Sequence, residues 1–575
     1  MQIRKLSIKN FRGIRSLEWR PNVSLCGIIG PGDSGKSTIL DAIEAALSSR
    51  WLTFSESDFL GCDSSKTILI EATIGELSKS LKSDERFGLQ MRGWTAKQEI
   101  RDEPEDDDEP VLTVRLSVDA TMEPVWELVS ERADFPRVLS NRDRALFGVT
   151  RLAGDDARHT SWAQGSVLSK LTDDTGQAAE HLAVAYKAAR ESANLQKIEP
   201  LMAAANCAEI EAKALGAYVG GAYHPGLELG RGGFSTSSIA LHDDGIPLRL
   251  AGLGSRRLAT LAIQKSAIAE GAIVLIDEIE HGLEPHRIVG AMCQLKRGQA
   301  ESAKAARSIG QIFLTTHSDV ALGEVSAENV FVLRRDRATK LASMRTPGSS
   351  ADFDKLMKRA PRALFSRKIL LCEGVTEMGI LLGLREFWTP ARNGIPLEQL
   401  GVAIADGNGS QAPGYALALA RLGFPVAIFR DSDRDIPPNE LIELAGAGVV
   451  VLEYNEPMDT ETALITASDD TTVEKLLGVA RTAKSDIAVQ AHLRNVFKNI
   501  GPEILASPFD LWSGATGQDG QILRRGVAKA ASDKSWFKEK NTGQEIAPIV
   551  WEVIQRADGS QLASCLSKVE EWVYA

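Results

Sequence analysis

Residues 23–37 read VSLCGIIGPGDSGKS, a short apolar segment followed by a glycine-rich turn. The turn fits the pattern G-x-x-x-x-G-K-[ST], and an amphipathic helix is expected to start near Lys36. Backbone N–H groups of such a loop surround phosphates, the lysine meets the β- and γ-phosphate charges, and the serine hydroxyl can ligate magnesium. The stretch therefore predicts an ATP-binding phosphate loop in an α/β domain. Its predicted nucleotide contacts are Gly30, Gly32, Asp33, Ser34, Gly35, Lys36, Ser37 and Thr38.

Two later apolar segments end in polar residues. Residues 273–278, IVLIDE, predict a buried strand that ends in two acids, where parallel sheets bind ligands. Asp277 is predicted to hold the magnesium and Glu278 to orient or deprotonate the attacking water. Residues 312–318, IFLTTHS, predict another strand, and the order of the two segments favours His317 as a γ-phosphate sensor over a purely structural histidine.

The segment LAGLGSRR at 250–257 precedes a predicted helix. It resembles the signature turn of ABC-type ATPases, although it departs from their usual wording Leu-Ser-Gly-Gly-Gln. That resemblance implies that Gly254 and Ser255 contact the γ-phosphate held by a second subunit. A homodimer or a higher homo-oligomer is therefore expected.

The C-terminal half carries acids at two further predicted strand ends. LLCEGVTE at 370–377 contains Glu373 and Glu377, and VAIFRDSD at 426–433 ends in Asp431 and Asp433, which would point the same way if the strand continued. Bringing such carboxylates within 4 Å costs about 4 kcal/mol per pair at an effective dielectric constant of 20, so a cluster implies a cation. Oxygen ligands favour Mg²⁺ or Mn²⁺ over zinc.

A glycine-flanked acid followed two strands later by Asp-x-Asp resembles the Toprim pattern of topoisomerases, primases and nucleases. IKNFRGI at 8–14 resembles the heads of chromosome-maintenance and DNA-repair ATPases. The combination is similar to the OLD (overcoming lysogenisation defect) family, which includes the nuclease subunit of Gabija-type phage defence. The resemblance implies a metal-dependent phosphodiesterase site. Its implied residues are the catalytic Glu373, Asp431, Asp433 and Lys538, and the metal ligands Glu373, Glu377, Asp431, Asp433 and Glu461, with Asp406 in an assisting position.

The expected fold is α/β, with an ABC-type P-loop ATPase domain followed by a Toprim α/β domain. The ATPase head is expected at 1–170 and 220–350, interrupted by a helical insertion at 171–219 that could serve as a dimerisation arm. A linker is expected within 339–366, where proline, glycine and serine are followed by mixed charge. The Toprim domain and a C-terminal helical region are expected at 366–575.

These patterns predict an ATP-regulated, metal-dependent endonuclease that cleaves DNA by two-metal hydrolysis. The family resemblance alone implies a role in defence against phage and a helicase or another defence protein as partner. One alternative is a Toprim nuclease that acts on RNA such as tRNA. Another is an ATPase sensor or scaffold whose Toprim site is inactive.

Composition limits the remaining classes. The chain has 575 residues, 43% of them hydrophobic, and a net charge of -11, which argues against a uniformly basic nucleic-acid binder. No apolar run approaches the roughly 20 residues that span a bilayer, so a cytoplasmic protein without membrane contact is expected. The six cysteines form no CxxC pair and are expected to be reduced and buried. The acidic run at 102–110 is expected to be a solvated loop.

Overall fold

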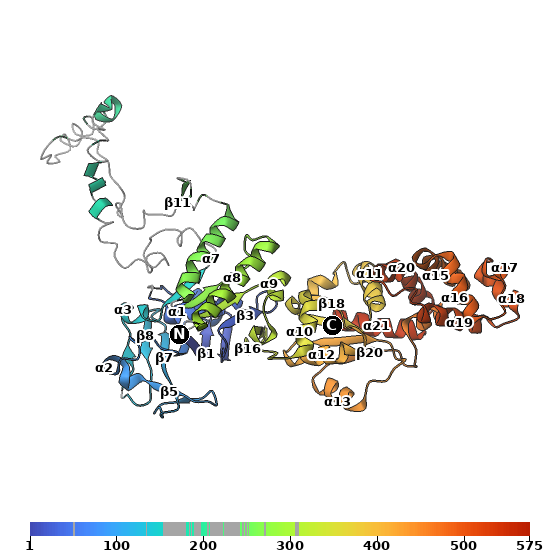
Figure 1. Ribbon diagram of the computed structural model, residues 1–575, viewed down its shortest axis with the longest axis horizontal. Coiled ribbons are helices and arrows are strands. Elements are labelled where there is room, and N and C mark those ends of the chain that lie inside the picture. The colour runs from blue at the N-terminus through green and yellow to red at the C-terminus, as the bar shows by residue number, and fades with distance from the viewer. Residues whose placement is uncertain are drawn as a thin grey trace. The chain divides into compact units, whose positions relative to one another are not determined.

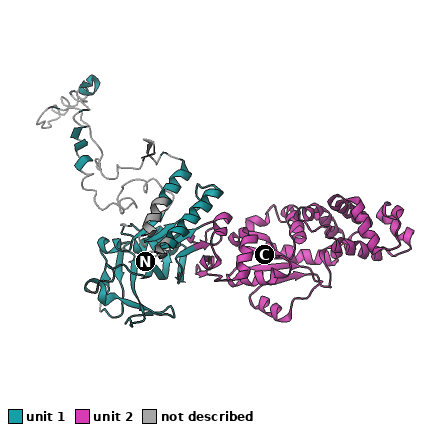
Figure 2. Cartoon of the chain, viewed as in Figure 1, with its two compact units in different colours: residues 1–26, 37–315 teal, residues 27–36, 316–575 magenta. Residues whose placement is uncertain are grey.

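The computed structural model describes residues 1–49, 52–133, 135–152, 252–269, 272–304 and 310–575, with short pieces between 180 and 250. The chain divides into two compact units, unit 1 with residues 1–26 and 37–315 and unit 2 with residues 27–36 and 316–575 (Figure 2). Most of the expected helical insertion at 171–219 lies outside the described residues. Within the described part of the chain, no helix has the length and apolar character needed to cross a membrane.

Unit 1 contains an antiparallel sheet with the strand order β2-β1-β4-β7-β5-β6, in which β8 pairs with β7 and β9. Strand β1 lies inside the sheet, because it pairs with β2 on one side and β4 on the other. The strands are β1 (Gln2–Phe11), β2 (Ile14–Trp19), β4 (Ile68–Gly75), β5 (Arg92–Trp94), β6 (Ile100–Arg101), β7 (Glu109–Val118), β8 (Pro124–Leu128) and β9 (Arg137–Val138).

Unit 1 also contains several short elements. They are η1 (Glu56–Asp58), η2 (Leu60–Cys62), α2 (Asp84–Phe87), η3 (Gly88–Gln90), α3 (Asn141–Ala145), β11 (His242–Asp243) and β12 (Ile246–Pro247). The acidic run at 102–110 is partly paired, since Asp102 contacts Arg92 and the Asp108 side chain, only 6% exposed, contacts Arg101. It is therefore less solvated than its charge predicts.

Unit 1 also contains three parallel strands, β10 (Val149–Leu152), β13 (Ile273–Ile276) and β14 (Gln311–Thr315), paired in that order. Every residue of β13 and β14 is buried, as expected for parallel strands covered on both faces. The helices are α1 (Lys36–Leu47), α7 (Leu253–Ala269) and α8 (Pro285–Lys304), of which α7 and α8 pack together (Figure 1). The predicted alternation of strand and helix is confirmed here.

In unit 2, the last residues of β3 (Leu25–Ile29) pair in parallel with β15 (Val330–Arg335), which pairs antiparallel with β16 (Ala342–Arg345). Gly30 follows β3 with a φ of +153°, and a Cβ there would lie 2.5 Å from the Leu333 carbonyl oxygen. Only glycine fits this position, so the start of the phosphate loop is fixed by its contact with β15.

The segment 339–366, expected to be a linker, lies within unit 2 and is mostly ordered. It contains β16, α10 (Ala351–Arg359) and η9 (Pro361–Phe365), and follows α9 (Asp319–Gly323) and η8 (Ala327–Asn329). The Ser350 side chain caps α10, and the apolar face of that helix buries Phe353, Leu356 and Met357. Pro347, Gly348, Ser349 and Ser350 form the short turn before α10.

The second sheet of unit 2 is wholly parallel, with the order β18-β17-β19-β20. The strands are β17 (Lys368–Cys372), β18 (Val402–Asp406), β19 (Val426–Arg430) and β20 (Val450–Glu453), and the intervening elements are α11 (Val375–Ala391), η10 (Leu397–Leu400), η11 (Gly409–Gln411), α12 (Ala412–Arg421) and α13 (Pro438–Gly446). The predicted β-α-β-α-β order is confirmed, and it places the carboxyl ends of β17, β18 and β19 at one edge of the sheet.

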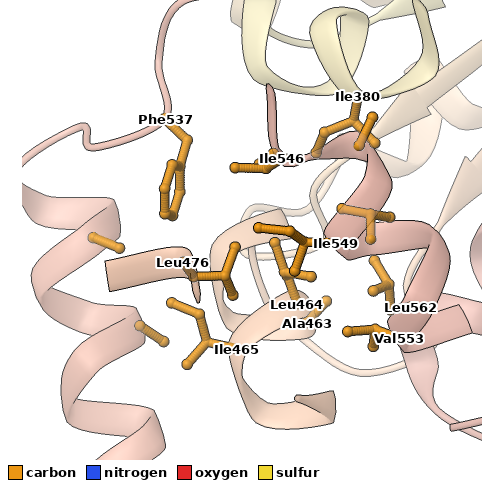
Figure 3. Close-up of a cluster of buried hydrophobic side chains, with 14 of the residues drawn as sticks. Ile380, Ala463, Leu464, Ile465, Leu476, Phe537, Ile546, Ile549, Val553 and Leu562 are labelled. Atoms are coloured by element: carbon orange, nitrogen blue, oxygen red, sulfur yellow. The ribbon is translucent and has the colours of Figure 1, made fainter. Parts of the chain in front are cut away.

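A helical region completes unit 2 and packs on this sheet. Its helices are α14 (Thr460–Ala467), α15 (Asp470–Lys484), α16 (Asp486–Val496), α17 (Pro502–Leu505), η12 (Phe509–Leu511), α18 (Trp512–Thr516), α19 (Gly520–Asp533), α20 (Lys540–Arg556) and α21 (Gln561–Tyr574). Figure 3 shows Ile380 of α11 near Ile546 of α20, with Leu464 of α14 in the same buried cluster. Burying each such side chain contributes roughly 1.5–3 kcal/mol, so this cluster fixes α11, α14 and α20 together.

Two glycines allow α11 and α20 to approach closely. A Cβ on Gly379 would lie 2.5 Å from the Lys540 carbonyl oxygen and 2.8 Å from the Gly543 Cα. Backbone meets backbone here, as in other small-residue helix contacts. The contact holds the segment before α20, which carries Lys538, beside the first turns of α11.

Candidate functional sites

The phosphate loop holds its lysine against its own backbone. The Lys36 side chain is buried, and its Nζ donates to the carbonyl oxygens of Gly30 at 3.0 Å and Pro31 at 3.1 Å. Gly35 has a φ of +100°, which keeps the turn into α1 tight. The ammonium group is thereby placed inside the loop, where a bound phosphate would be its natural partner.

Asp277 follows β13 and is held by several polar groups of unit 1. Its Oδ1 accepts hydrogen bonds from Ser37 Oγ at 3.1 Å and Thr315 Oγ1 at 2.7 Å. Its Oδ2 lies 3.1 Å from Nη2 of Arg151, a side chain only 11% exposed. The structure therefore brings together Ser37 and Asp277, the two residues predicted to ligate the nucleotide-bound magnesium.

Glu278 lies beside Asp277 but has different surroundings. Its side chain is 55% exposed, and its φ of +47° is uncommon for a residue with a Cβ. The turn is held because Glu278 N donates to Thr315 Oγ1 and Arg257 Nη2 donates to the carbonyl oxygens of Asp277 and Glu278. The strained turn presents this carboxylate to solvent, an arrangement consistent with contact to an incoming water.

The remaining predicted nucleotide contacts fall on helix starts and loops. Gly254 and Ser255 lie in the first turn of α7, and a Cβ on Gly254 would meet Arg287 Nη1 at 2.8 Å. His317 follows β14, and its ring centroid lies 6.2 Å from that of Phe365. Their roles at the γ-phosphate stay predictions.

At the carboxyl edge of the parallel sheet in unit 2, a cavity of about 310 Å³ collects most of the predicted metal ligands. Glu373 comes from the end of β17, Glu377 from the first turn of α11, and Asp431 from the end of β19. The full lining is Arg359, Glu373, Gly374, Val375, Thr376, Glu377, Asp406, Asn408, Gly409, Asp431, Glu461 and Lys538. Glu461 and Lys538, which were carried over from the family resemblance, therefore share the cavity with the acids of the two motifs. We call it the Toprim cavity.

Burial and mutual repulsion hold protons on these acids. Burial, together with the charges of the nearby Glu461 and Glu373, raises the pKa of Glu377 to about 7. Burial also raises the pKa of Asp431 to about 8 and that of Glu461 to about 7. Carboxyl groups whose charged forms are disfavoured in this way gain from a nearby cation.

Two oxygens in the Toprim cavity are buried without a hydrogen-bond partner, Glu373 Oε2 and Glu461 Oε1. Arg430 Nε lies 3.5 Å from Glu373 Oε2, which is an ion-pair contact but a poor hydrogen bond. Orphaned carboxylate oxygens are costly in a protein interior, and a divalent cation would satisfy them. As the side chains stand, no three acids, histidines or cysteines in the described part of the chain are close enough to bind one metal ion. The donor chemistry thus fits Mg²⁺ or Mn²⁺, with side-chain rotation needed to close the shell.

Asp433 lies elsewhere. Strand β19 ends at Arg430, the chain turns at Asp431, and Asp433 is exposed and does not line the Toprim cavity. The strand does not continue, so the condition under which Asp431 and Asp433 would point the same way is not met. The assignment of Asp433 as a metal ligand stays a prediction.

The sequence reasoning missed several residues that shape these sites. Thr460 donates to Asp431 Oδ1 from its backbone N at 2.9 Å and its Oγ1 at 2.8 Å. A Cβ on Gly374 would lie 2.7 Å from Glu377 Oε2, so the glycine leaves room for that side chain. The Glu-Gly pair was a usable signal for Gly374, whereas Arg151, Arg359 and Thr460 carry no local motif.

Among the described residues, no cysteine lines the Toprim cavity. Cys26, Cys372 and Cys565 are buried, and burial raises the pKa of the Cys372 thiol well above its usual range. Cys62 and Cys293 are exposed, so the expectation of burial is wrong for them. Cys207 lies outside the described residues.

Comparison with known proteins gave matches to families and to solved structures. No curated protein matches the sequence. The solved structures include an SMC head bound to the C-winged helix domain of ScpA, with 18% identity over 62% of this chain and 100% of that one, at a TM-score of 0.35. The SMC head domain from Thermotoga maritima is 14% identical over 60% of this chain and 99% of that one, at a TM-score of 0.28. Scores this low do not establish a shared fold.

The family matches cover three segments. An AAA ATPase domain matches residues 1–105, and an AAA domain described as a putative AbiEii toxin of a type IV toxin–antitoxin system matches residues 213–323. The Toprim domain of overcoming lysogenization defect protein-like sequences matches residues 364–433, which carry Glu373, Glu377, Asp406, Asp431 and Asp433. The fold is mixed α/β with a C-terminal Toprim domain. AAA ATPase and Toprim domains together imply, in general, the use of a nucleotide and a divalent metal. AAA ATPase segments are thus followed by an OLD-like Toprim domain, an order that matches an OLD-family ATPase–Toprim fusion.

Proposed function

We propose that the protein is an ATP-regulated, metal-dependent endonuclease that hydrolyses DNA phosphodiester bonds in the Toprim cavity. The observation that carries the proposal is the convergence of Glu373, Glu377, Asp431 and Glu461 with Lys538 in that cavity. Acids with raised pKa values and orphaned oxygens, beside a lysine, make up the residue set of a metal-assisted phosphoryl-transfer site.

The residues that line the Toprim cavity would have different roles in catalysis. Bound Mg²⁺ or Mn²⁺ would supply Lewis acidity and a water of lowered pKa. Glu373, Glu377, Asp431 and Glu461 would hold the cations, while Thr460 orients Asp431 through its two hydrogen bonds. Lys538, which is exposed at the cavity, would offset charge on the scissile phosphate.

Hydrolysis is favoured over a covalent protein intermediate. Tyr454 is the nearest tyrosine in sequence to the Toprim acids, and it is fully buried, with its hydroxyl bonded to Thr460 Oγ1 at 3.0 Å. Burial raises the pKa of Tyr454 well above its usual range, which disfavours a phenolate nucleophile. A metal-held water is the attacking group that the cavity fits best.

The nucleotide site would regulate this chemistry. The proposed contacts are the phosphate loop with Lys36, the pair Ser37 and Asp277 for magnesium, and Glu278 for the attacking water. The family resemblance adds to the proposal a homodimer that shares nucleotides through Gly254 and Ser255, a role in phage defence, a relation to the Gabija nuclease subunit and a helicase partner. A cytoplasmic location is proposed because the sequence has no long apolar run.

A direct test incubates the protein with supercoiled plasmid and, separately, with total cellular RNA, in Mg²⁺ or Mn²⁺ and with or without ATP. We expect metal-dependent nicking of the plasmid by the wild type and none by Asp431→Ala. Cleavage of RNA alone would replace the DNA substrate by RNA. If neither nucleic acid is cleaved by a folded wild type that hydrolyses ATP, the protein is a sensor or scaffold and the proposal fails.

A further inference from the structure

One side chain that lines the Toprim cavity comes from outside the parallel sheet and the helical region. Arg359 is the last residue of α10, which precedes the segment that matches the Toprim family model at 364–433. Only Arg359 and Lys538 bring positive charge to a lining that contains Glu373, Glu377, Asp406, Asp431 and Glu461. These two side chains are therefore the groups of the lining that can attract a phosphate.

Arg359 is held by a single carboxylate. Its Nε donates to Asp406 Oδ2 at 2.9 Å, and its Nη2 donates to the same oxygen. The other Asp406 oxygen accepts from Asn408 N at 2.8 Å. A guanidinium carries five N–H donors, so this pair uses two of them on one oxygen. Asp406 therefore binds the guanidinium through one carboxylate oxygen instead of two.

The pair is accessible. The Arg359 side chain is 40% exposed and that of Asp406 is 14% exposed. Ion pairs that water reaches contribute little to stability, so exchange of Asp406 for another anion is easy. Arginine binds phosphate oxygens through two parallel hydrogen bonds, a geometry that Asp406 does not satisfy here.

The backbone that carries Arg359 is fixed. Ser350 caps α10, Phe353 and Leu356 are buried, and Asp354 Oδ1 accepts a hydrogen bond from Ala327 N. Helix α10 also packs against α12. The helix therefore presents the guanidinium at a set place, and only the side chain has to move to change partner.

We propose that Arg359 gives up its ion pair with Asp406 when substrate enters the Toprim cavity. It then binds a backbone phosphate of the nucleic acid beside the scissile bond. This inference rests on the proposed function, because it names a phosphate contact of the same site. The contrasting role is a structural tether, in which Arg359 only ties α10 to the end of β18.

The test measures affinity for a fluorescently labelled oligonucleotide in EDTA, so that neither cleavage nor metal binding contributes. DNA and RNA versions of one sequence are compared at several salt concentrations, with full-length wild type, Arg359→Ala, Asp406→Asn and Arg385→Ala. Arg385 is the matched control, because its side chain is also 40% exposed and pairs with one acid, Glu398 at 2.9 Å, without lining the cavity.

We expect Arg359→Ala to weaken binding about tenfold, the usual effect of losing a charged hydrogen bond, and to reduce the slope of log affinity against log salt by roughly 0.7–0.9. Asp406→Asn removes the competing anion, so binding should be unchanged or tighter. Arg385→Ala should match the wild type. Tighter binding of the DNA or of the RNA oligonucleotide identifies the nucleic acid that Arg359 contacts.

The proposal is overturned if Arg359→Ala keeps the wild-type affinity and salt slope, or if it and Asp406→Asn weaken binding equally, as a tether predicts. It is also overturned if the wild type shows no salt-dependent binding of either oligonucleotide. Failure of the nuclease proposal is read separately, from absent plasmid cleavage in Mn²⁺. A protein that binds through Arg359 without cleaving would keep this inference and lose the nuclease activity.

Discussion

Asp277 in unit 1 and Glu461 in unit 2 are both acids predicted to ligate a divalent cation, yet their surroundings differ. Asp277 accepts hydrogen bonds from Ser37 and Thr315 and pairs with Arg151. Glu461 is 3% exposed, its Oε1 has no hydrogen-bond partner, and burial raises its pKa to about 7. The protein itself stabilises the carboxylate of the nucleotide site, whereas the Toprim cavity leaves that task to a cation.

The largest effect is expected for Glu461→Gln, which tests whether Glu461 binds a metal. If the orphaned oxygen binds an essential metal, plasmid cleavage in Mn²⁺ should fall about 100-fold or more, and ATP hydrolysis should stay within about twofold of the wild type. Glu552→Gln is the control, because Glu552 forms a surface ion pair with Lys475 away from the cavity. Undiminished cleavage by Glu461→Gln would remove Glu461 from the metal site.

Lys36→Ala tests the other side of the comparison. The Lys36 ammonium lies inside the phosphate loop, so ATP hydrolysis should fall about 100-fold, in the range found when a group that stabilises developing charge is deleted. Metal-dependent cleavage without nucleotide should stay within about twofold. A protein that loses both activities would show that the two sites are not chemically separate.

The Gly379→Ala variant tests the close packing of α11 against α20 beside the Toprim cavity. The added methyl group would meet the α20 backbone at 2.5–2.8 Å, so we expect a loss of about 1–3 kcal/mol in the free energy of unfolding, measured in urea. Gly446→Ala in α13 is the control, since a Cβ there meets nothing within 4 Å. Equal stability of the two variants would contradict the close contact of α11 and α20.

Metal addition should distinguish the two kinds of acid by thermal unfolding. Without nucleotide, Mn²⁺ at about 100 times its dissociation constant adds about 2.7 kcal/mol to the stability of the form that binds it, which corresponds to a rise of roughly 2–5 °C in the midpoint. The rise should be smaller in Glu461→Gln and unchanged in Glu552→Gln. A rise of the same size in all three proteins would place the metal outside the Toprim cavity.

The smallest effect is expected for Asp433→Asn. Asp433 is exposed and outside the cavity lining, so cleavage should fall at most about tenfold, less than for Asp431→Asn measured beside it. An equal loss in both variants would mean that the turn at 431–435 moves onto the cavity when metal binds. Asp433 would then regain the role that its motif predicts.

The elements that the sequence predicted well are those whose signal is local. The apolar segments that became β13, β14, β17 and β19 each end in polar residues, so both the strands and their functional ends could be read from the sequence. The glycine-rich loop before α1 has a pattern that combines conformation and charge.

What could not be predicted depends on long-range contacts. Thr460 reaches Asp431 across 29 residues, and Arg359 reaches Asp406 across 47. Neither pair has a periodicity or a motif. The turn after Arg430 was missed for a related reason, because the Asp-x-Asp pattern occurs both on strands and in turns. The order in the segment 339–366 was not predicted, because the helix that follows its turn residues is short and carries mixed charge.

The ordered segment between β15 and β17 has a consequence for proteolysis. Arg334 lies over the Phe424 ring, with 4.8 Å from its Cζ to the centroid, and donates to the Arg367 carbonyl oxygen, while Arg345 donates to that of Arg421. A protease that cuts the turn at 346–350 would sever one covalent connection and leave these contacts in place. The two fragments should therefore elute together in native gel filtration and separate only in denaturant.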